Sequence, residues 1–148
     1  MKRSWILFIV ILAVVTFNLP YVANQVGAAE NVIKLGIVGP LTGQFAAVGQ
    51  SQLYGAEMMA KELNASGGKY KIELLSEDDA SNCDQSVNAT VKLITQNKTV
   101  SILGACNSPC ALAMVPITKR YKVPQFTFGV GTAITMQGSE WVFRVAMG

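Results

Sequence analysis

The chain has 148 residues, about the length of one domain, and 51% of them are hydrophobic while 14% are charged. This composition supports a packed core and excludes an intrinsically disordered chain. Two of the 12 basic residues, Lys2 and Arg3, lie before residue 29, so the later chain carries ten basic against nine acidic residues. A balance so close to neutrality does not indicate a nucleic-acid-binding surface.

The first 29 residues have the three parts of a secretory signal peptide. Lys2 and Arg3 precede an apolar run of 13 residues at 5–17, and small side chains at 27–29 offer a cleavage site after either of the two alanines. The alternative is an uncleaved anchor, but a helix of that length rises roughly 20 Å, short of a hydrocarbon core of about 30 Å. We predict a cleaved signal peptide at 1–29. Because no cysteine lies near the cleavage site, the sequence favours a soluble exported protein over a lipoprotein.

The later chain alternates between strand and helix patterns. In chain order, these patterns predict a strand at 32–38, a helix at 49–63, a strand at 71–75, a helix at about 84–96, a strand at 100–103, a helix at 108–121, a strand at 123–128 and a strand at 141–146. The segment 77–82 is expected to be a polar loop, and Ser108 is expected to cap the third helix with Pro109 at its first position. This order predicts an α/β fold with a doubly wound parallel sheet.

Three loops, at 39–48, 105–108 and 129–132, are expected at the edge formed by the carboxyl ends of the strands. Sheets of this kind bind ligands at that edge. Ser108 and Thr132 each follow a strand and can precede a helix, whose free N–H groups and partial positive charge favour a carboxylate. Both are candidate ligand-binding residues, and the alternative is that each only caps its own helix.

Particular residues disfavour other kinds of site. Gly129 and Gly131 begin a dinucleotide-binding pattern, but Ile134 stands where its third glycine belongs. The chain contains no histidine, which argues against a catalytic triad, an activated thiol and a zinc site. The acidic residues at 77–79 lack the spacing of a calcium-binding loop. We therefore expect a binding protein rather than an enzyme, with no cofactor and no metal.

The chain has three cysteines, Cys83, Cys106 and Cys110. In an exported protein they allow one disulfide and leave one cysteine over. We expect Cys83 to pair with one of the other two, which would join the loop after the second strand to the loop after the third.

Several segments taken in order resemble the branched-chain amino acid (Leu/Ile/Val) binding proteins of ABC transporters. These segments are IKLGIVGPLTG at 33–43, GAE at 55–57, LNASGG at 63–68, EDDA at 77–80, ILG at 102–104 and VFR at 142–144. The resemblance covers essentially all of residues 32–148. It implies the fold of a type I periplasmic binding protein, in which two α/β lobes enclose the ligand and the first lobe has the strand order 2-1-3-4-5.

On this resemblance, residues 30–148 form an incomplete N-terminal ligand-binding lobe, and the second lobe is absent. The implied protein is a monomeric, periplasmic solute-binding component that delivers a branched-chain amino acid, or a related small carboxylate or amide, to an ABC transporter permease. The alternative is an extracellular sensory domain of a receptor on the same fold. A third possibility, an exported hydrolase, is disfavoured because histidine is missing.

The resemblance also implies roles for individual residues. Ser108 matches a serine that binds the carboxylate of the ligand, and Gly129 matches a residue whose carbonyl accepts from its amino group. Thr132, or Gly131 in an ungapped match, corresponds to a threonine that binds the carboxylate. Val48 stands where some amino acid binders place a tyrosine. The usual cysteine positions are occupied by Ser81 and Asn107, so the resemblance leaves the disulfide pairing open.

Overall fold

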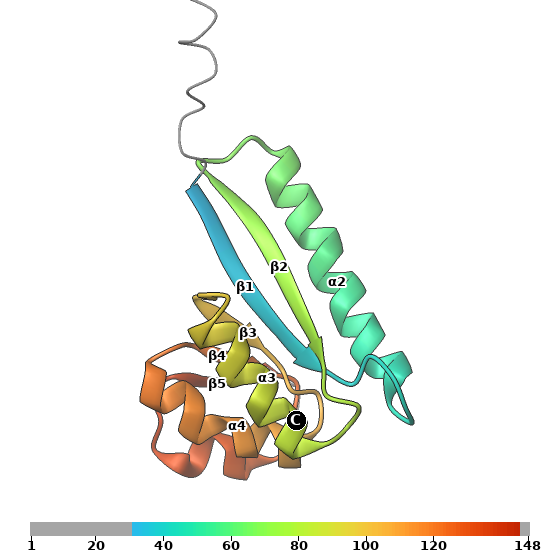
Figure 1. Ribbon diagram of the computed structural model, residues 1–148, viewed down its shortest axis with the longest axis vertical. Helices are drawn as coiled ribbons and strands as arrows, with labels where there is room; N and C mark the ends of the chain where they lie inside the picture. The colour runs from blue at the N-terminus through green and yellow to red at the C-terminus, as the bar shows by residue number, and fades with distance from the viewer. Residues whose placement is uncertain (1–30, 146–148) are drawn as a thin grey trace, which may run out of the picture. The chain divides into compact units, whose positions relative to one another are not determined.

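The computed structural model describes residues 31–145, and the predicted signal peptide at 1–29 lies outside them. Within these residues, strands and helices alternate along the chain, as Figure 1 shows. The elements are β1 (Asn31–Gly39), α2 (Ala46–Ala65), β2 (Tyr70–Asp78), α3 (Cys83–Thr95), β3 (Ser101–Leu103), α4 (Ser108–Tyr121), β4 (Gln125–Thr127), the 3-10 helix η1 (Thr132–Gln137) and β5 (Val142–Arg144).

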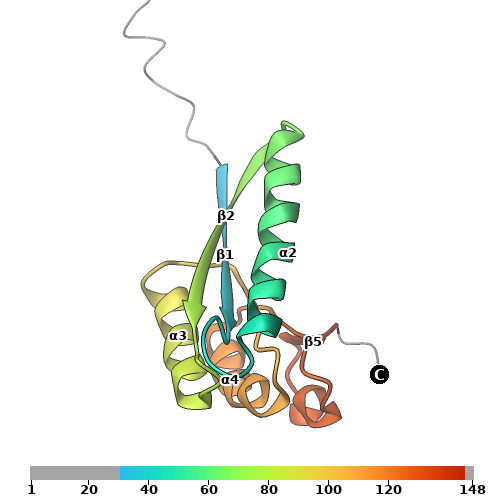
Figure 2. The ribbon, with the colours of Figure 1, turned by 90° about the vertical axis from the view of Figure 1, so that its right-hand side faces the viewer.

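The five strands form one parallel sheet in the order β2-β1-β3-β4-β5. The predicted α/β class and strand order are therefore confirmed. Helix α2 lies on one face of β1 and β2, whereas α3 lies on the opposite face (Figure 2). A parallel sheet is normally covered on both faces, because its crossover helices pack there.

The main core lies on the face of the sheet that α3 and α4 cover. Leu93 from α3, Met114 from α4 and Ile102 from β3 are all fully buried there, together with Val38 from β1. Gly36 belongs to the same face, because a Cβ atom on it would lie 2.8 Å from Cδ1 of Ile102 and 3.0 Å from Cδ1 of Leu93. The alternation along β1 places every second side chain in this core.

The opposite face carries a row of apolar side chains that runs across the sheet. In register, Ile37 pairs with Leu103, Leu103 with Phe126, and Phe126 with Phe143. The rings of Phe126 and Phe143 stack with their centroids 5.1 Å apart, and Phe143 remains exposed. The predicted apolar spacing of α2 directs Met59 toward this face, yet about half of Met59 is also exposed. In the described residues, this face is therefore only partly covered.

Several sequence expectations about the elements are wrong. Helix α2 begins at Ala46, so residues 46–48 belong to it and not to the predicted loop at 39–48. Strand β4 covers only Gln125–Thr127 of the predicted 123–128, and β5 only Val142–Arg144 of the predicted 141–146. Strand β2 does not end at residue 75 but continues to Asp78, because it pairs with β1 as far as the partners Gly39 and Asp78. Ser108 does not cap α4, because Asn107 does so: Oδ1 of Asn107 accepts a 3.2 Å hydrogen bond from the N–H of Cys110. Pro109 follows in the first turn, where its missing N–H costs nothing.

No helix within residues 31–145 is long and apolar enough to cross a membrane.

Candidate ligand-binding site

The loop between β3 and α4 packs directly on the end of β1. Gly104 has a φ of 142°, and a Cβ atom on it would lie 2.0 Å from the carbonyl oxygen of Val38. Only glycine fits this position, since both the backbone conformation and the contact exclude a side chain. The Gly104–Ala105 peptide bond is cis. The tight packing fixes where the chain turns toward Ser108.

The Ser108 side chain faces the loop that follows β4. Because Asn107 caps α4, the Ser108 hydroxyl is not used for capping, and its Oγ accepts a 2.9 Å hydrogen bond from the N–H of Gly131. A hydroxyl has one hydrogen to donate and two lone pairs. Accepting from Gly131 therefore leaves the hydrogen of Ser108 for an outside acceptor. Ser108 is half-buried.

The two glycines of the loop after β4 let the two loops approach each other closely. A Cβ atom on Gly129 would lie 3.1 Å from Cα of Ser108 and 2.8 Å from Cδ1 of Ile134. On Gly131 it would lie 3.1 Å from Cβ of Ser108. The carbonyl between these glycines, on Val130, accepts a 2.7 Å hydrogen bond from Arg144 of β5. The loop is thus held from both sides.

The structure brings together some of the predicted site residues and separates others. Ser108, Gly129 and Gly131 form one cluster, and Thr132 follows directly as the first residue of η1. The N-cap residue of η1 is Gly131, which has no side chain. Thr132 therefore lies inside this helix and does not cap it. Val48 lies on a different element, in the first turn of α2, where it is exposed.

Sequence reasoning missed Thr127, the last residue of β4. Its hydroxyl donates a 2.7 Å hydrogen bond to the carbonyl of Ala105 and accepts one of 3.0 Å from the N–H of Gly129. Thr127 is fully buried. The only signal in the sequence was a threonine inside a strand pattern, which is common in strands for reasons of packing alone.

The predicted acidic loop is a set of three carboxylates with separate partners. Glu77 forms a 2.7 Å ion pair with Lys92 of α3. Asp78 accepts from the N–H of Leu41 at 2.8 Å and from the hydroxyl of Thr42 at 2.5 Å, so it holds the loop after β1. These bonds, led by the one from Thr42, lower the pKa of Asp78 below its ordinary value.

Asp79 is the third carboxylate and is fully buried. Its Oδ2 accepts a 2.7 Å hydrogen bond from the hydroxyl of Ser86, and its Oδ1 accepts one of 2.9 Å from the N–H of Ser81. Burial of a carboxylate is costly unless such bonds compensate for it. Asp79 therefore shapes the turn between β2 and α3. Within residues 31–145, no group of three acidic, cysteine or histidine side chains is arranged to hold a metal ion.

The structure forms one of the two disulfides that the sequence left open, between Cys83 and Cys110. The bond joins the first residue of α3 to the first turn of α4. Cys106 remains free and half-buried. Burial is the larger cause that raises the pKa of the Cys106 thiol, and the negative charge of Asp79 is the second. A raised pKa disfavours the thiolate, which is the reactive form.

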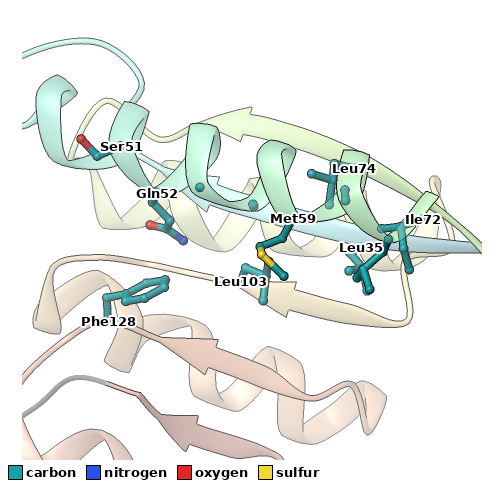
Figure 3. Close-up of a pocket in the computed structure, with 12 residues that line it drawn as sticks. Leu35, Ser51, Gln52, Met59, Ile72, Leu74, Leu103 and Phe128 are labelled. Carbon is teal, nitrogen blue, oxygen red and sulfur yellow. The ribbon is translucent and has the colours of Figure 1, made fainter. Parts of the chain in front are cut away.

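An apolar groove of about 470 Å³ lies apart from this cluster, between α2 and the partly covered face of the sheet. Figure 3 shows Leu35 and Leu74 toward one end and Gln52 and Phe128 toward the other. The amide atoms of Gln52 are buried without a hydrogen-bond partner. The groove does not include Ser108, Gly129 or Thr132, so the candidate ligand-binding residues belong to the sheet edge and not to the groove.

Strand order 2-1-3-4-5 and loops gathered at the carboxyl edge define an open, doubly wound α/β lobe. Proteins of this class bind their ligands at that edge. Residues 32–148 match the model of the family described as periplasmic binding protein. The chain belongs to this family.

Curated relatives carry names of amino acid binding proteins. The Leu/Ile/Val-binding protein homolog 7 of Brucella abortus is 34% identical over 127 residues, which cover 82% of this chain and 32% of the relative. The amino acid binding protein of Pseudomonas aeruginosa is 29% identical over 76% of this chain and 31% of the relative. The chain thus spans about a third of the length of the curated relatives it matches.

Solved structures show the same lobe. The branched-chain amino acid transporter substrate binding protein LivJ of Streptococcus pneumoniae, in complex with isoleucine, has a TM-score of 0.74 and 27% identity, covering 77% of this chain and 33% of that one. A solute binding protein of an ABC transporter from Rhodopseudomonas palustris, in complex with 3,4-dihydroxybenzoic acid, has a TM-score of 0.69 and 30% identity, covering 78% of this chain and 32% of that one. The family of this chain is thus one of ABC transporter substrate-binding proteins.

Proposed function

We propose that the protein captures a small carboxylate for import by an ABC transporter, and that the candidate loops form one half of its binding cleft. The observation that carries this proposal is the Ser108–Gly131 hydrogen bond, because it leaves the Ser108 hydroxyl hydrogen for a ligand oxygen. A hydrogen bond to a carboxylate is stronger than one between neutral groups. Gly129 and Thr132 lie beside it and supply a carbonyl acceptor and a further hydroxyl.

The ligand class follows from the relatives. One similar solved structure contains isoleucine and others contain 3,4-dihydroxybenzoic acid or 4-hydroxybenzoate. These ligands share a carboxylate and differ in the rest of the molecule. The donors around Ser108 serve the shared group, whereas Val48 has an exposed apolar side chain and offers no polar group. We therefore infer a branched-chain amino acid or an aromatic acid.

The proposal also includes the cellular setting. Cleavage of the signal peptide at 1–29 would release a monomeric protein into the periplasm, where its ligand-bound form would dock on the permease. The oxidising environment there suits the Cys83–Cys110 disulfide. Capture and delivery of a solute require binding and no chemical reaction, so we propose that the protein is not an enzyme.

The test is a titration of the protein expressed from its complete gene, without residues 1–29. Calorimetry would use L-leucine, L-isoleucine, 4-hydroxybenzoate and 3,4-dihydroxybenzoate. We expect one of the two ligand classes to bind, and we expect Ser108→Ala to weaken that binding by about 1–3 kcal/mol. If none of the four compounds produces a heat of binding, the proposal is wrong. If Ser108→Ala binds with unchanged affinity, Ser108 is not part of the site.

A sensory role on the same fold is the second candidate. One similar structure, from Rhodopseudomonas palustris HaA2, is named as an extracellular ligand-binding receptor, with a TM-score of 0.68 and 26% identity. A membrane-spanning helix encoded after the ligand-binding region would favour the receptor. Uptake of a labelled ligand that stops when the gene is deleted would favour transport.

A further inference from the structure

The hydroxyl of Thr127 is the one group in the described residues that bonds directly to both loops of the candidate site. It donates to the carbonyl of Ala105 at 2.7 Å and accepts from the N–H of Gly129 at 3.0 Å. Ala105 precedes α4 by three residues, and Gly129 is itself a candidate ligand-binding residue. The hydroxyl therefore uses its hydrogen on one loop and a lone pair on the other.

Strand packing alone does not require a hydroxyl at this position. Thr127 is fully buried in a strand, where valine has nearly the same shape and is equally suited to the sheet. A buried hydroxyl is costly unless both its hydrogen and its oxygen find partners. Here both partners are main-chain atoms of the loops and not of the sheet.

The polar face of β4 continues beneath the same loop. Gln125, two residues before Thr127, is also fully buried. Its Nε2 donates to the carbonyls of Ala111 at 2.9 Å and Gly104 at 3.3 Å. Gln125 thus supports the first residue of the loop and the start of α4, while Thr127 supports the residue that follows Gly104.

The bond from Gly129 to Thr127 also fixes one end of the second loop. The other end is fixed by the bond from Gly131 to Ser108, and the carbonyl of Val130 is held by Arg144. The carbonyl of Gly129 lies between these fixed points. Its direction is therefore constrained by the hydrogen bonds that hold the loop on both sides of it.

We propose that Thr127 is a positioning residue for ligand binding, whose hydroxyl fixes the spacing between Ser108 on one loop and the Gly129 carbonyl on the other. This inference rests on the proposed function, because the spacing matters only if Ser108 and the Gly129 carbonyl bind the same ligand. Precise spacing matters for affinity, since a binding site that is preorganised avoids the cost of ordering its loops when the ligand arrives.

The test compares three variants of the protein expressed from its complete gene. Thr127→Val removes the hydroxyl and keeps the shape, whereas Thr127→Ser keeps the hydroxyl. Thr90→Val is the matched control: Thr90 is also fully buried and donates at 2.7 Å, but to the carbonyl of Ser86 within α3, away from the site. If Thr127→Val does not fold, Thr127→Ala takes its place.

The first readout is the affinity for L-isoleucine and 4-hydroxybenzoate, measured beside the melting temperature. We expect Thr127→Val to bind about tenfold more weakly, because the loops lose both hydrogen bonds to this hydroxyl and must then be ordered when the ligand binds, and Thr127→Ser to bind like the parent. Thr90→Val should lose thermal stability and keep its affinity. Unchanged affinity in Thr127→Val, or an equal loss in Thr90→Val, overturns the proposal.

The second readout needs no ligand. Hydrogen exchange of the Gly129 N–H, followed by NMR, should be slow in the parent and in Thr127→Ser and faster in Thr127→Val. If the parent protein binds none of the four compounds used to test the proposed function, that function fails, and the exchange rate of Gly129 still decides whether Thr127 holds the loop. An unchanged exchange rate in Thr127→Val overturns the inference whatever the ligand.

Discussion

The main-chain N–H of Gly131 donates a 2.9 Å hydrogen bond to Oγ of Ser108, and this bond joins the loops that follow two neighbouring strands, β3 and β4. The bond requires close approach, which Gly131 permits because it has no side chain. A ligand oxygen that accepts from the Ser108 hydroxyl would therefore meet a group whose orientation is already fixed by the second loop. Preorganisation of this kind reduces the cost of binding.

Gly131→Ala tests how much the site depends on this approach. The new Cβ would lie 3.1 Å from Cβ and 3.2 Å from Oγ of Ser108, so one of the loops must shift by a few tenths of an ångström. We expect the variant to lose about 1–3 kcal/mol of folding free energy through overpacking, and to bind its ligand more weakly. Denaturation and calorimetry measure the two effects.

The control for that variant is Gly68→Ala, because a Cβ atom on Gly68 meets nothing within 4 Å. We expect Gly68→Ala to retain both the stability and the affinity of the parent. If Gly131→Ala behaves like this control, the two loops are not closely packed in solution and the Ser108–Gly131 contact does not organise the site.

Asp78 gives a prediction for the dependence of stability on pH. Its pKa is lowered in the folded protein, chiefly by the hydroxyl of Thr42. Its contribution to stability is therefore present above its pKa in the unfolded chain, about 3.9, and is lost as the pH falls through the lower folded value. We expect Asp78→Asn to be less stable than the parent at pH 7, by about 1 kcal/mol because the group is exposed.

Chemical denaturation at several pH values measures this effect. The difference between Asp78→Asn and the parent should shrink below about pH 4. Glu73→Gln is the control on the same strand, since Glu73 has only an exposed contact of 4.0 Å with Lys34. A difference that stays constant from pH 7 to pH 3 would show that Asp78 does not act through its charge.

The fold was predictable because its signals are local and repeated. Apolar residues at 32–38 and the helix pattern at 49–63 belong to elements whose type the periodicity determines. The end of β2 was not predictable in this way. Residues 77 and 78 are acidic and resemble a loop, but pairing with β1 and the bonds to Lys92 and Thr42 retain them in the strand.

The candidate site was predictable only in part. Ser108 and the glycines at 129 and 131 could be placed at the sheet edge, because parallel strands end there together. Thr127 could not be identified, because its role depends on two main-chain atoms that are 22 residues and two residues away in sequence. The capping residue was also misplaced: Asn107 and Ser108 are both good caps, and tertiary packing decides between them.

Cys106 is expected to react slowly with alkylating reagents. Burial and the charge of Asp79 raise the pKa of its thiol, so less thiolate is present at neutral pH than in an exposed cysteine. The rate of alkylation by iodoacetamide, measured from pH 7 to pH 10 by mass spectrometry, should rise at a higher pH than that of N-acetylcysteine. A midpoint below that of the free thiol would contradict the arrangement of Cys106 and Asp79.

The Cys83–Cys110 disulfide should provide a large part of the stability of the described lobe. The bond closes a segment with a sequence separation of 27, and restricting the unfolded chain over such a loop is worth about 3–4 kcal/mol in the chain-entropy account. We expect Cys83→Ser and Cys110→Ser to lower the free energy of unfolding by similar amounts, and Cys106→Ser to leave it nearly unchanged. Urea denaturation with and without a reducing agent measures these differences. Peptide mapping of the oxidised protein checks the pairing. A Cys83–Cys106 peptide, or a loss of stability in Cys83→Ser and Cys106→Ser but not in Cys110→Ser, would show that the other bridge forms and that the start of α4 is held differently.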